Sequence, residues 1–320
     1  MTMELAGCLL GTAAPHSLED YQKGVTRWCN GCGDNAILTA VQRLCRDEDL
    51  APERTVFVSG IGCSSRLPHY MSTYGFHGTH GRPLPIAEGV KMARPDLHVF
   101  VSTGDGDCLS IGAAHWIHAI RYNMDLTVLL HDNRIYGLTK KQASPTSPLG
   151  TKTNTTPKGS YLPALDPLSV TLGVANVSFV AQAVDWIPEM LYRIVAAAYR
   201  HKGLSFVRIV QRCPEFMPGA LDPWVQDPSR TRLLSHERGV EIPADLAKVY
   251  RERREHDPRD LAAARALAAD QDTIPVGILY RDDDAPRYEE LRGAGRLRTP
   301  ADVRRGLETE LDRFTIGAGA

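Results

Sequence analysis

Residues 98–107, which read HVFVSTGDGD, decide the fold that this sequence predicts. The run opens with apolar and β-branched residues that do not alternate with polar ones, which is typical of a strand buried on both faces. It ends in Gly104-Asp105-Gly106, and glycines allow a backbone to approach a bound group closely. Residues 109–122 then have the length of a crossover helix, and a second apolar run fills residues 126–130. This order predicts a strand–helix–strand unit with a polar loop after its first strand.

The same alternation of strand and helix patterns extends from about residue 53 to residue 212. Buried strands are also predicted for residues 56–59 and 205–210, and the second of these follows a helical stretch over residues 187–201. Alternation of this kind favours an α/β fold with a mostly parallel sheet and helices on both faces.

Two segments depart from this pattern. Residues 144–168 hold five prolines together with Ser, Thr and Gly, and a loop of that length is typical of a functional flap or a partner contact. After about Gln226 the composition shifts toward Arg, Glu, Asp and Ala, with a charge run at residues 281–284. We therefore expect a main domain over residues 1–225 and a charged, helical or irregular C-terminal extension over residues 226–320. This extension would pack on the core or on a partner subunit.

Composition excludes several classes of protein. The 320 residues carry 37 basic and 38 acidic side chains, a formal charge of −1, which gives no reason to expect nucleic-acid or membrane-surface binding. No apolar run approaches the ~20 residues that span a bilayer. The segment before Ser17 has no basic residue ahead of its apolar part, so we do not expect a secretory signal. Seven cysteines, an odd number, then indicate the reducing cytoplasm rather than a disulfide framework.

The residues that follow the predicted strands are of one kind. Each strand end carries glycine, a hard oxygen ligand or a cysteine, at residues 60–64, 104–107, 131–133 and 211–213. Ligands of open parallel sheets bind in the crevice beyond the carboxyl ends of the strands. Four such ends together predict one site at that edge.

Asp105 and Asn133 are the most informative pair within this site. They are separated by one helix and one strand, so both can reach a single point above neighbouring strands. A carboxylate, an amide oxygen, a backbone carbonyl and two phosphate oxygens form the kind of shell that Mg²⁺ prefers. A Gly-Asp-Gly sequence alone is often only a turn, but with the asparagine at this distance it favours a diphosphate–magnesium site.

This arrangement resembles the thiamine-diphosphate signature, in which Gly-Asp-Gly is followed by Asn. More closely, residues 28–213 resemble the β subunits of the 2-oxoacid:ferredoxin oxidoreductases. The matching segments keep the order of that family and lie at residues 28–33, 60–64, 77–82, 104–107 and 136–140. Two departures stand out. Lys141 occupies a position where members of the family often have glycine, and the resemblance does not extend beyond about Gln226.

The resemblance implies a set of binding residues. Mg²⁺ would be bound by Asp105, Asn133 and the carbonyl of Ile135. Thiamine diphosphate would be contacted by Ile61, Gly62, Cys63, Ser64, His80, Gly104, Gly106, Asp107, Gly137 and Leu138. His80 would bond a diphosphate oxygen or donate a proton. Arg66 and Lys140 are candidates to meet a substrate carboxylate, although solvated side chains are an equal alternative for both.

The cysteines leave two kinds of metal centre open. Cys29 and Cys32 form a C-x-x-C pair, and zinc would require a second close pair that the sequence lacks. An iron–sulfur cluster also requires four cysteines, some of which arrive from distant parts of the chain. The resemblance assigns Cys29, Cys32, Cys63 and Cys213 to one [4Fe–4S] cluster. Cys8, Cys45 and Cys108 belong to no motif and are interpreted as small buried or unpaired side chains.

The function implied by the resemblance is the coenzyme A-dependent oxidative decarboxylation of a 2-oxoacid, with electrons passed through the cluster to ferredoxin. A partner α subunit would supply the glutamate that activates thiamine. We do not assign that role to Glu88, so the chain alone is expected to be inactive. Two cationic candidates favour 2-oxoglutarate over pyruvate. A non-redox thiamine lyase or ligase, and a non-enzymatic zinc-bound interaction module, remain as alternatives.

Overall fold

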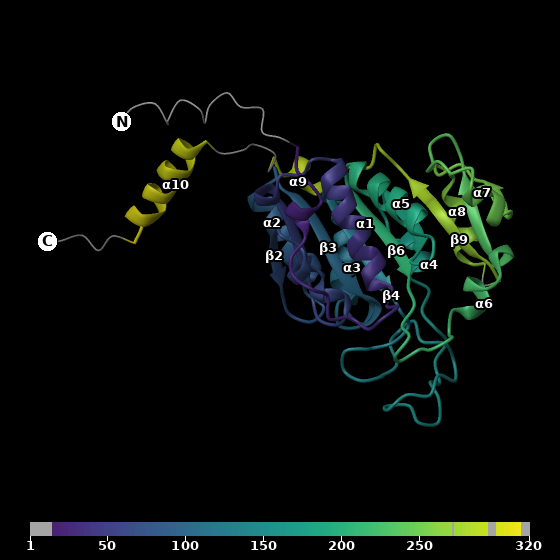
Figure 1. The fold of residues 1–320 in the computed structure, drawn as a ribbon. Helices are drawn as coiled ribbons and strands as arrows, with labels where there is room; N and C mark the ends of the chain where they lie inside the picture. Colours follow the sequence, from purple (N-terminus) through teal and green to yellow (C-terminus); the bar gives the residue numbers. More distant parts are fainter. Residues whose placement is uncertain (1–14, 271, 294–298, 315–320) are drawn as a thin grey trace, which may run out of the picture.

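A nine-stranded sheet forms the centre of the molecule in the computed structural model, which describes residues 15–270, 272–293 and 299–314 (Figure 1). The strand order is β2-β1-β3-β4-β6-β5-β9-β7-β8. All neighbouring strands are parallel except β5 and β9, which are antiparallel. The strands are β1 Thr55–Ser59, β2 Tyr74–His77, β3 His98–Gly104, β4 Leu126–Asp132, β5 Phe179–Val184, β6 Leu204–Val210, β7 Thr231–Ser235, β8 Arg253–Glu255 and β9 Ile274–Arg281.

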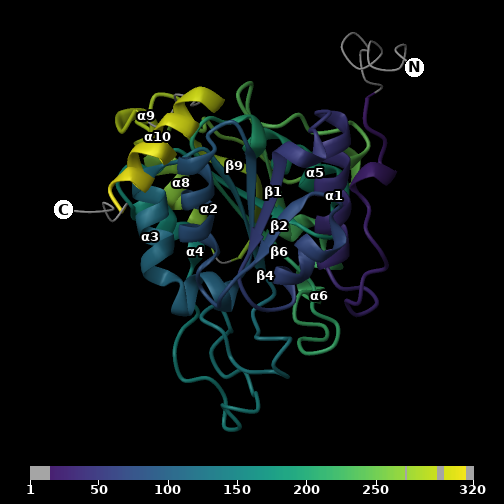
Figure 2. The same cartoon turned by 90° about the vertical axis from the view of Figure 1, so that its left-hand side faces the viewer.

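Helices cover both faces of the sheet, as the sequence predicts (Figure 2). On one face α1 Asp34–Asp47 and α5 Pro188–Arg200 pack into a core that includes the stacked rings of Phe57 and Phe100. The opposite face holds a second core, in which Trp116 stacks on Phe206. Its helices are α2 Pro83–Ala93, α3 Ala113–Tyr122, α4 Pro167–Gly173 and α8 Leu261–Ala268. The fold class is therefore confirmed.

The remaining elements are mostly short. They comprise the 3₁₀ turns Glu19–Tyr21, Pro52–Arg54, Ser64–Tyr70 and Pro228–Arg230, a π-helical turn Asp107–Ile111, and the four-residue helices α6 Asp222–Val225, α7 Leu246–Val249 and α9 Tyr288–Leu291. A longer helix, α10 Pro300–Asp312, follows them. In the described part of the chain no helix has the length and apolar character that crossing a membrane requires. Cys8 lies outside the described residues.

The C-terminal extension differs from its expected character. It is not only helical and irregular, because β7, β8 and β9 extend the sheet of the main domain. Buried side chains of the extension complete both cores, among them Leu233 and Val276 on one face and Leu234 and Leu279 on the other. These strands were missed because β7 mixes arginine with apolar residues, β8 is a short exposed strand of charged residues only, and β9 contains a proline and a glycine. The sequence also missed β2, an exposed four-residue edge strand, and β5.

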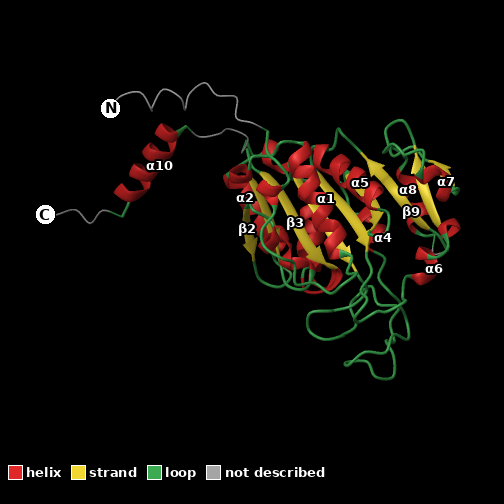
Figure 3. Ribbon diagram, in the orientation of Figure 1, coloured by secondary structure: helices red, strands yellow, loops and turns green. Residues whose placement is uncertain are grey.

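The strands predicted from continuous apolar runs are present, and their order along the sheet matters for the site. β1, β3, β4 and β6 are consecutive parallel neighbours, so the four loops that follow them emerge at one edge. The proline-rich segment has no regular element until α4 begins at Pro167, and Figure 3 shows these long loops extending beyond that edge.

Lys140 and Lys141, in the loop after β4, have left-handed backbone conformations, with φ of 74° at both residues. Side chains with a Cβ rarely adopt this region because the Cβ approaches the backbone too closely. A glycine at position 141, the departure noted from the sequence, would avoid this contact. The loop keeps this conformation with lysine, at a cost in stability.

We predict that Lys141→Gly raises the free energy of unfolding by up to about 1 kcal/mol, because relief of the left-handed strain exceeds the added entropy of an unfolded glycine. Urea denaturation of the full chain measures this change. Lys141→Ala serves as the control, since it retains a Cβ and gains no comparable stability. Equal stability of the two variants would contradict the assignment of strain to this position.

Candidate cofactor site

A cavity of about 100 Å³ lies at the carboxyl ends of β1, β3 and β4. Every residue that the sequence assigns to thiamine diphosphate or to Mg²⁺ lines it, together with His131, Tyr136 and Thr139. The residues predicted to hold the magnesium ion, Asp105, Asn133 and Ile135, are among them. The fold therefore brings four distant segments of the chain to one place, which is the arrangement that a shared ligand requires.

Asp107 connects three of these segments. Its side chain is 2% exposed, and its Oδ1 accepts hydrogen bonds from the backbone N–H groups of Ile61 (3.0 Å) and Gly81 (2.7 Å). The Nδ1 of His80 lies 2.6 Å from the same oxygen, and the Thr103 hydroxyl donates to Oδ2 at 2.8 Å. A buried carboxylate with this many donors fixes the loops after β1, β2 and β3 relative to one another.

Two glycines are required by close contacts within these loops. A Cβ on Gly60 would lie 2.0 Å from an oxygen of Asp107, and a Cβ on Gly106 would lie 2.1 Å from the ring of Tyr136. The Tyr136 hydroxyl also donates to the carbonyl of Gly106 at 2.9 Å. Glycine at these positions therefore permits the tight packing of loop against loop that forms the wall of the cavity.

Asp105 is bound by the proline-rich segment. Its Oδ2 accepts hydrogen bonds from the hydroxyls of Ser144 (2.5 Å) and Thr146 (2.6 Å), and Thr146 also lies 2.8 Å from Oδ1 of Asp132. Burial, together with the neighbouring Asp132 carboxylate, raises the pKa of Asp105 to about 7. A cation would offset this concentration of buried negative charge. The oxygen ligands at this position therefore fit Mg²⁺. The proline-rich segment, expected from the sequence to be a functional flap, contacts the site directly through Ser144 and Thr146.

The four cysteines predicted to bind a cluster are neighbours. Cys213 contributes to raising the pKa of the Cys32 and Cys63 thiols, and Cys29 contributes to raising those of Cys63 and Cys213, after burial as the main cause in each case. The indole N–H of Trp28 donates to the carbonyl of Cys63 at 2.8 Å. A Cβ on Gly137 would lie 3.3 Å from the Cys63 sulfur, which places that sulfur at the wall of the cofactor cavity.

These sulfurs are not arranged as the ligands of one ion. Within the described residues, no group of three or more His, Cys, Asp or Glu side chains has the spacing that holds a single metal ion.

A buried histidine–aspartate pair connects the cysteines with the cofactor cavity, and the sequence did not predict it. His131 Nδ1 lies 2.7 Å from Oδ1 of Asp34, and its Nε2 lies 3.1 Å from the Ser102 hydroxyl. Ser102 in turn donates to the carbonyl of Ser64 at 2.9 Å, while Asp34 accepts a hydrogen bond from the Cys32 thiol at 3.4 Å. Nothing in the sequence spacing of Asp34 and His131 marks them as partners.

The three residues proposed as catalytic lie in different settings. His80 lines the cavity and is oriented by Asp107. Arg66 lies in the 3₁₀ turn after Cys63 and is not part of the lining, and Lys140 is exposed at the left-handed turn. The structure therefore brings His80 to the cofactor residues, but it does not bring the two cations into the cavity wall.

Glu88 on α2 is a buried carboxyl outside the cavity wall. Its Oε1 has no hydrogen-bond partner in the described part of the chain, and burial raises its pKa to about 7. It is therefore a group whose ionisation is disfavoured by folding.

Comparisons with known proteins agree with this geometry. Residues 60–209 match the family model for the C-terminal TPP-binding domain of thiamine pyrophosphate enzymes, and residues 246–294 match that for the C-terminal part of the pyruvate ferredoxin oxidoreductase beta subunit. The 2-oxoglutarate oxidoreductase subunit KorB of Mycobacterium tuberculosis is 44% identical over 256 residues, which cover 76% of this chain and 68% of that protein. Subunit beta of 2-oxoacid:ferredoxin oxidoreductase 1 from Aeropyrum pernix is 37% identical over 263 residues, 82% of this chain and 80% of the relative.

The chain belongs to the 2-oxoacid:ferredoxin oxidoreductase β subunits. A solved structure supports the same fold. It is described as the 2-oxoglutarate:ferredoxin oxidoreductase of Magnetococcus marinus with 2-oxoglutarate, coenzyme A and succinyl-CoA bound. Its chain superposes with a TM-score of 0.75 at 34% identity, covering 91% of this β subunit and 96% of that chain.

Membership of this family corrects one expectation. The match over residues 246–294 lies in the extension, where the sequence suggested no resemblance beyond about Gln226. Together with the strands that the extension adds to the sheet, this match shows that the C-terminal part of the β subunit is related to the family as well. The expectation missed this because the extension contains no glycine- or cysteine-rich motif that would mark it.

We predict that Asp107→Asn lowers the free energy of unfolding by about 2–4 kcal/mol, because an amide cannot satisfy all the donors that point at this buried carboxylate. Chemical denaturation of the full chain measures the loss. Asp257→Asn, a change at an exposed carboxylate, is the matched control and should cost less than about 0.5 kcal/mol. An equal loss of unfolding free energy in both variants would contradict the conclusion that Asp107 holds the loops together.

We predict a pH-dependent gain for Glu88→Gln. The raised pKa means that the folded state loses stability as pH rises from about 4.5 to about 7, because the largely buried carboxyl resists ionisation in that range, and the loss is complete above it. The glutamine variant should thus be more stable than the native chain by about 1–3 kcal/mol near pH 8.5, with the gain vanishing near pH 4.5. Denaturation curves across this range test the prediction. Glu215→Gln, at an exposed position, should show no such trend, and a gain for Glu88→Gln that does not vary with pH would refute the account.

Proposed function

We propose that this β subunit, together with an α subunit, catalyses the coenzyme A-dependent oxidative decarboxylation of a 2-oxoacid. Electrons would pass to ferredoxin through a [4Fe–4S] cluster bound by Cys29, Cys32, Cys63 and Cys213. The observation that carries the proposal is the position of Cys63. Its sulfur lies at the wall of the cofactor cavity, and the nearby thiols of Cys213 and Cys29 add to the effect of burial in raising its pKa. An electron acceptor held there would lie beside the carbon that reacts.

The residues of the cavity have distinct tasks in this proposal. Asp105, Asn133 and the carbonyl of Ile135 would hold Mg²⁺ and, through it, the diphosphate of the cofactor. Ser144 and Thr146 orient the Asp105 carboxylate through their hydroxyl groups. Bound thiamine diphosphate would supply the carbanion that attacks the 2-oxo carbon and stabilises the charge left by the departing CO₂.

His80 is the proton-carrying group in this arrangement. The Nδ1 of His80 lies 2.6 Å from the Asp107 carboxylate, and this contact fixes the orientation of the imidazole ring. About one third of the His80 side chain is exposed. A histidine oriented in this way can bond a diphosphate oxygen or move a proton at the edge of the cavity.

The size of the cavity supports a shared active site. Pockets that enclose a cofactor-sized ligand measure about 300–1,000 Å³. The cavity in this β subunit measures about 100 Å³, so it would cover only part of thiamine diphosphate. The remaining cover, and the glutamate that activates the aminopyrimidine ring, would come from the α subunit. The isolated β subunit would then be inactive.

The substrate preference rests on the relatives. The proteins from Mycobacterium tuberculosis and Magnetococcus marinus both carry 2-oxoglutarate in their names, which supports 2-oxoglutarate over pyruvate. Arg66 and Lys140 add little to this preference, because neither lines the cavity. The relatives are oxidoreductase subunits, and this favours the redox function over a lyase or ligase and over a zinc-bound module. A cluster and free thiols are suited to the reducing cytoplasm, which we retain as the expected location.

Anaerobic co-expression with the α subunit tests the proposal. We expect a brown complex with about four iron atoms per β subunit and 2-oxoacid-dependent viologen reduction. Cys213→Ser should lose both the colour and the activity, whereas Asp105→Ala should keep the colour and lose the activity. Cys45→Ala is the control, since Cys45 is buried in the core of α1 and should leave both properties intact.

Viologen reduction measured with 2-oxoglutarate and with pyruvate, each added separately to the complex, tests the substrate preference. We expect a higher kcat/KM for 2-oxoglutarate than for pyruvate. A colourless complex that contains one zinc ion, or activity that survives Cys213→Ser, would contradict the redox proposal.

A further inference from the structure

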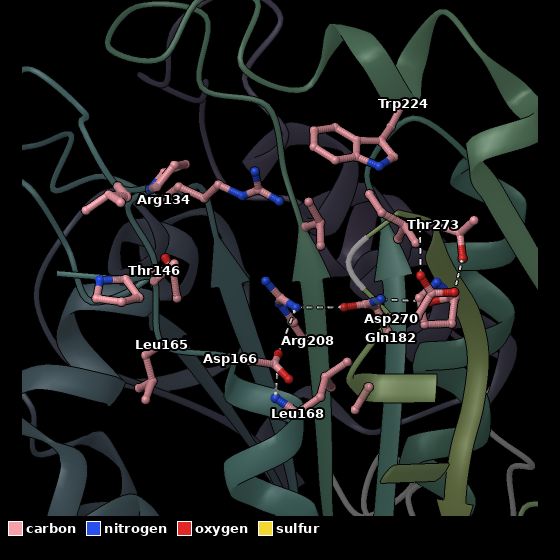
Figure 4. A pocket seen from close by; sticks show the side chains of 18 residues that line it. Arg134, Thr146, Leu165, Asp166, Leu168, Gln182, Arg208, Trp224, Asp270 and Thr273 are labelled. Carbon is pink, nitrogen blue, oxygen red and sulfur yellow. Dashed lines mark hydrogen bonds and ion pairs between the residues drawn. The ribbon is translucent and has the colours of Figure 1, made fainter. Parts of the chain in front are cut away.

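A second and larger cavity, of about 490 Å³, lies beside the cofactor site (Figure 4). Its floor is formed by side chains of β5 and β6, including Gln182 and Arg208, and one wall comes from the proline-rich segment. The opposite wall comes from the extension, at Trp224 and at residues 268–275. Its volume lies within the range of about 300–1,000 Å³ that is typical of pockets for small-molecule ligands. None of its residues is used in the function proposed above except Thr146.

Most charges around this cavity are balanced by protein partners. Nε and Nη2 of Arg208 both contact Oδ2 of Asp132, at 2.8 and 2.7 Å, and the remaining nitrogen of Arg208 lies 3.2 Å from the Gln182 oxygen and 3.4 Å from Asp166. Asp270 pairs with Arg232 at 2.9 Å. These groups therefore have no unmet charge to offer a ligand.

Arg134 is different. Figure 4 shows its guanidinium pointing into the cavity, between Trp224 and Arg208. It lies 5.3 Å from the centre of the Trp224 ring, and within the described ranges it makes no ion pair and no side-chain hydrogen bond. A guanidinium without an ion-pair partner can donate two parallel hydrogen bonds to a planar oxyanion.

The indole ring of Trp224 forms part of the wall beside Arg134. Its Nε1 is buried beyond the reach of a water-sized atom, so the ring offers the cavity an apolar face rather than a donor. Leu149, Leu165 and Ile274 add further apolar surface to the lining.

We propose that this cavity is a binding site for a small organic anion, in which an oxyanion accepts hydrogen bonds from Arg134 while an apolar body packs against the Trp224 ring and the leucine and proline walls. A carboxylate and a phosphate ester share this chemistry. The site is separate from the cofactor cavity, and its existence does not depend on the proposed reaction.

Binding of an anion in this cavity would affect the residues proposed to hold magnesium. Arg134 lies between Asn133 and Ile135 in the chain, so a ligand that holds its side chain also restrains the two neighbouring magnesium ligands. Thr146 borders the anion site and bonds the Asp105 carboxylate. By linkage, an anion that stabilises this arrangement raises the affinity for magnesium and thiamine diphosphate, and the cofactor raises the affinity for the anion by the same factor.

Isothermal titration of the complex with its α subunit, first freed of thiamine diphosphate and Mg²⁺, tests this site. The probes are phenyl phosphate and phenylacetate, which distinguish a phosphate from a carboxylate ligand, and the uncharged 2-phenylethanol. At least one anion should bind the native complex, and the alcohol should bind at least tenfold more weakly, since it offers no negative charge to the Arg134 guanidinium.

Variants assign the binding to its residues. Arg134→Gln should weaken binding of the anion at least tenfold. Arg134→Lys, which keeps the charge but not the planar fork of donors, should weaken it severalfold and keeps the test valid if the glutamine variant does not fold. Arg230→Gln is the matched control, because Arg230 lies 5.1 Å from the centre of the Trp224 ring but does not line the cavity, and its affinity should stay within twofold.

Failure of both anions to bind the native complex would overturn the inference, and so would binding that neither Arg134→Gln nor Arg134→Lys weakens. Because the titrations use neither a 2-oxoacid nor coenzyme A, a loss of binding is distinguishable from failure of the proposed reaction, which is measured separately as viologen reduction.

Discussion

The buried carboxylate of Asp107 is the constraint on which the rest of the cofactor site depends. It accepts hydrogen bonds from the loop after β1 and from the loop after β2, and it fixes His80 at the cavity edge. Without it, three glycine-rich loops would have to hold their relative positions through backbone contacts alone, and glycine makes such loops costly to order. The family resemblance assigns Asp107 to cofactor contact. In the structure the oxygens of Asp107 accept hydrogen bonds from the protein itself.

The parallel sheet supplies the platform for this constraint. Because β1, β3, β4 and β6 are neighbours and run in the same direction, their loops meet at one edge, and residues as distant in sequence as Cys63 and Cys213 become neighbours there. The same edge continues to the anion site, through the hydrogen bonds that connect Asp105 with Thr146 and the bond between Asp132 and Arg208. A cofactor site, a cysteine cluster and a second cavity are thus parts of one polar layer above the sheet.

The sequence predicted the features that local patterns encode. Continuous apolar runs identified β1, β3, β4 and β6, and the residues that follow them predicted a site at this edge. The family resemblance supplied the lining residues that do not directly follow a predicted strand, such as His80 and Leu138. The sequence did not predict features set by tertiary contacts. The pair of Asp34 and His131 joins residues from an early helix and a later strand, and no spacing rule connects them. The strands of the extension lack a clear period, because arginine, proline and glycine interrupt them, and they are strands because the edge of β5 is available for pairing.

The central claim is that an iron–sulfur cluster and thiamine diphosphate share this edge of the sheet, with Cys63 between them. Anomalous diffraction at the iron absorption edge, from anaerobic crystals of the complex with the α subunit, tests it most directly. The account predicts one strong iron peak surrounded by the sulfurs of Cys29, Cys32, Cys63 and Cys213, next to the density of the cofactor. Iron density elsewhere in the β subunit, with these four sulfurs protonated and unligated, would contradict it.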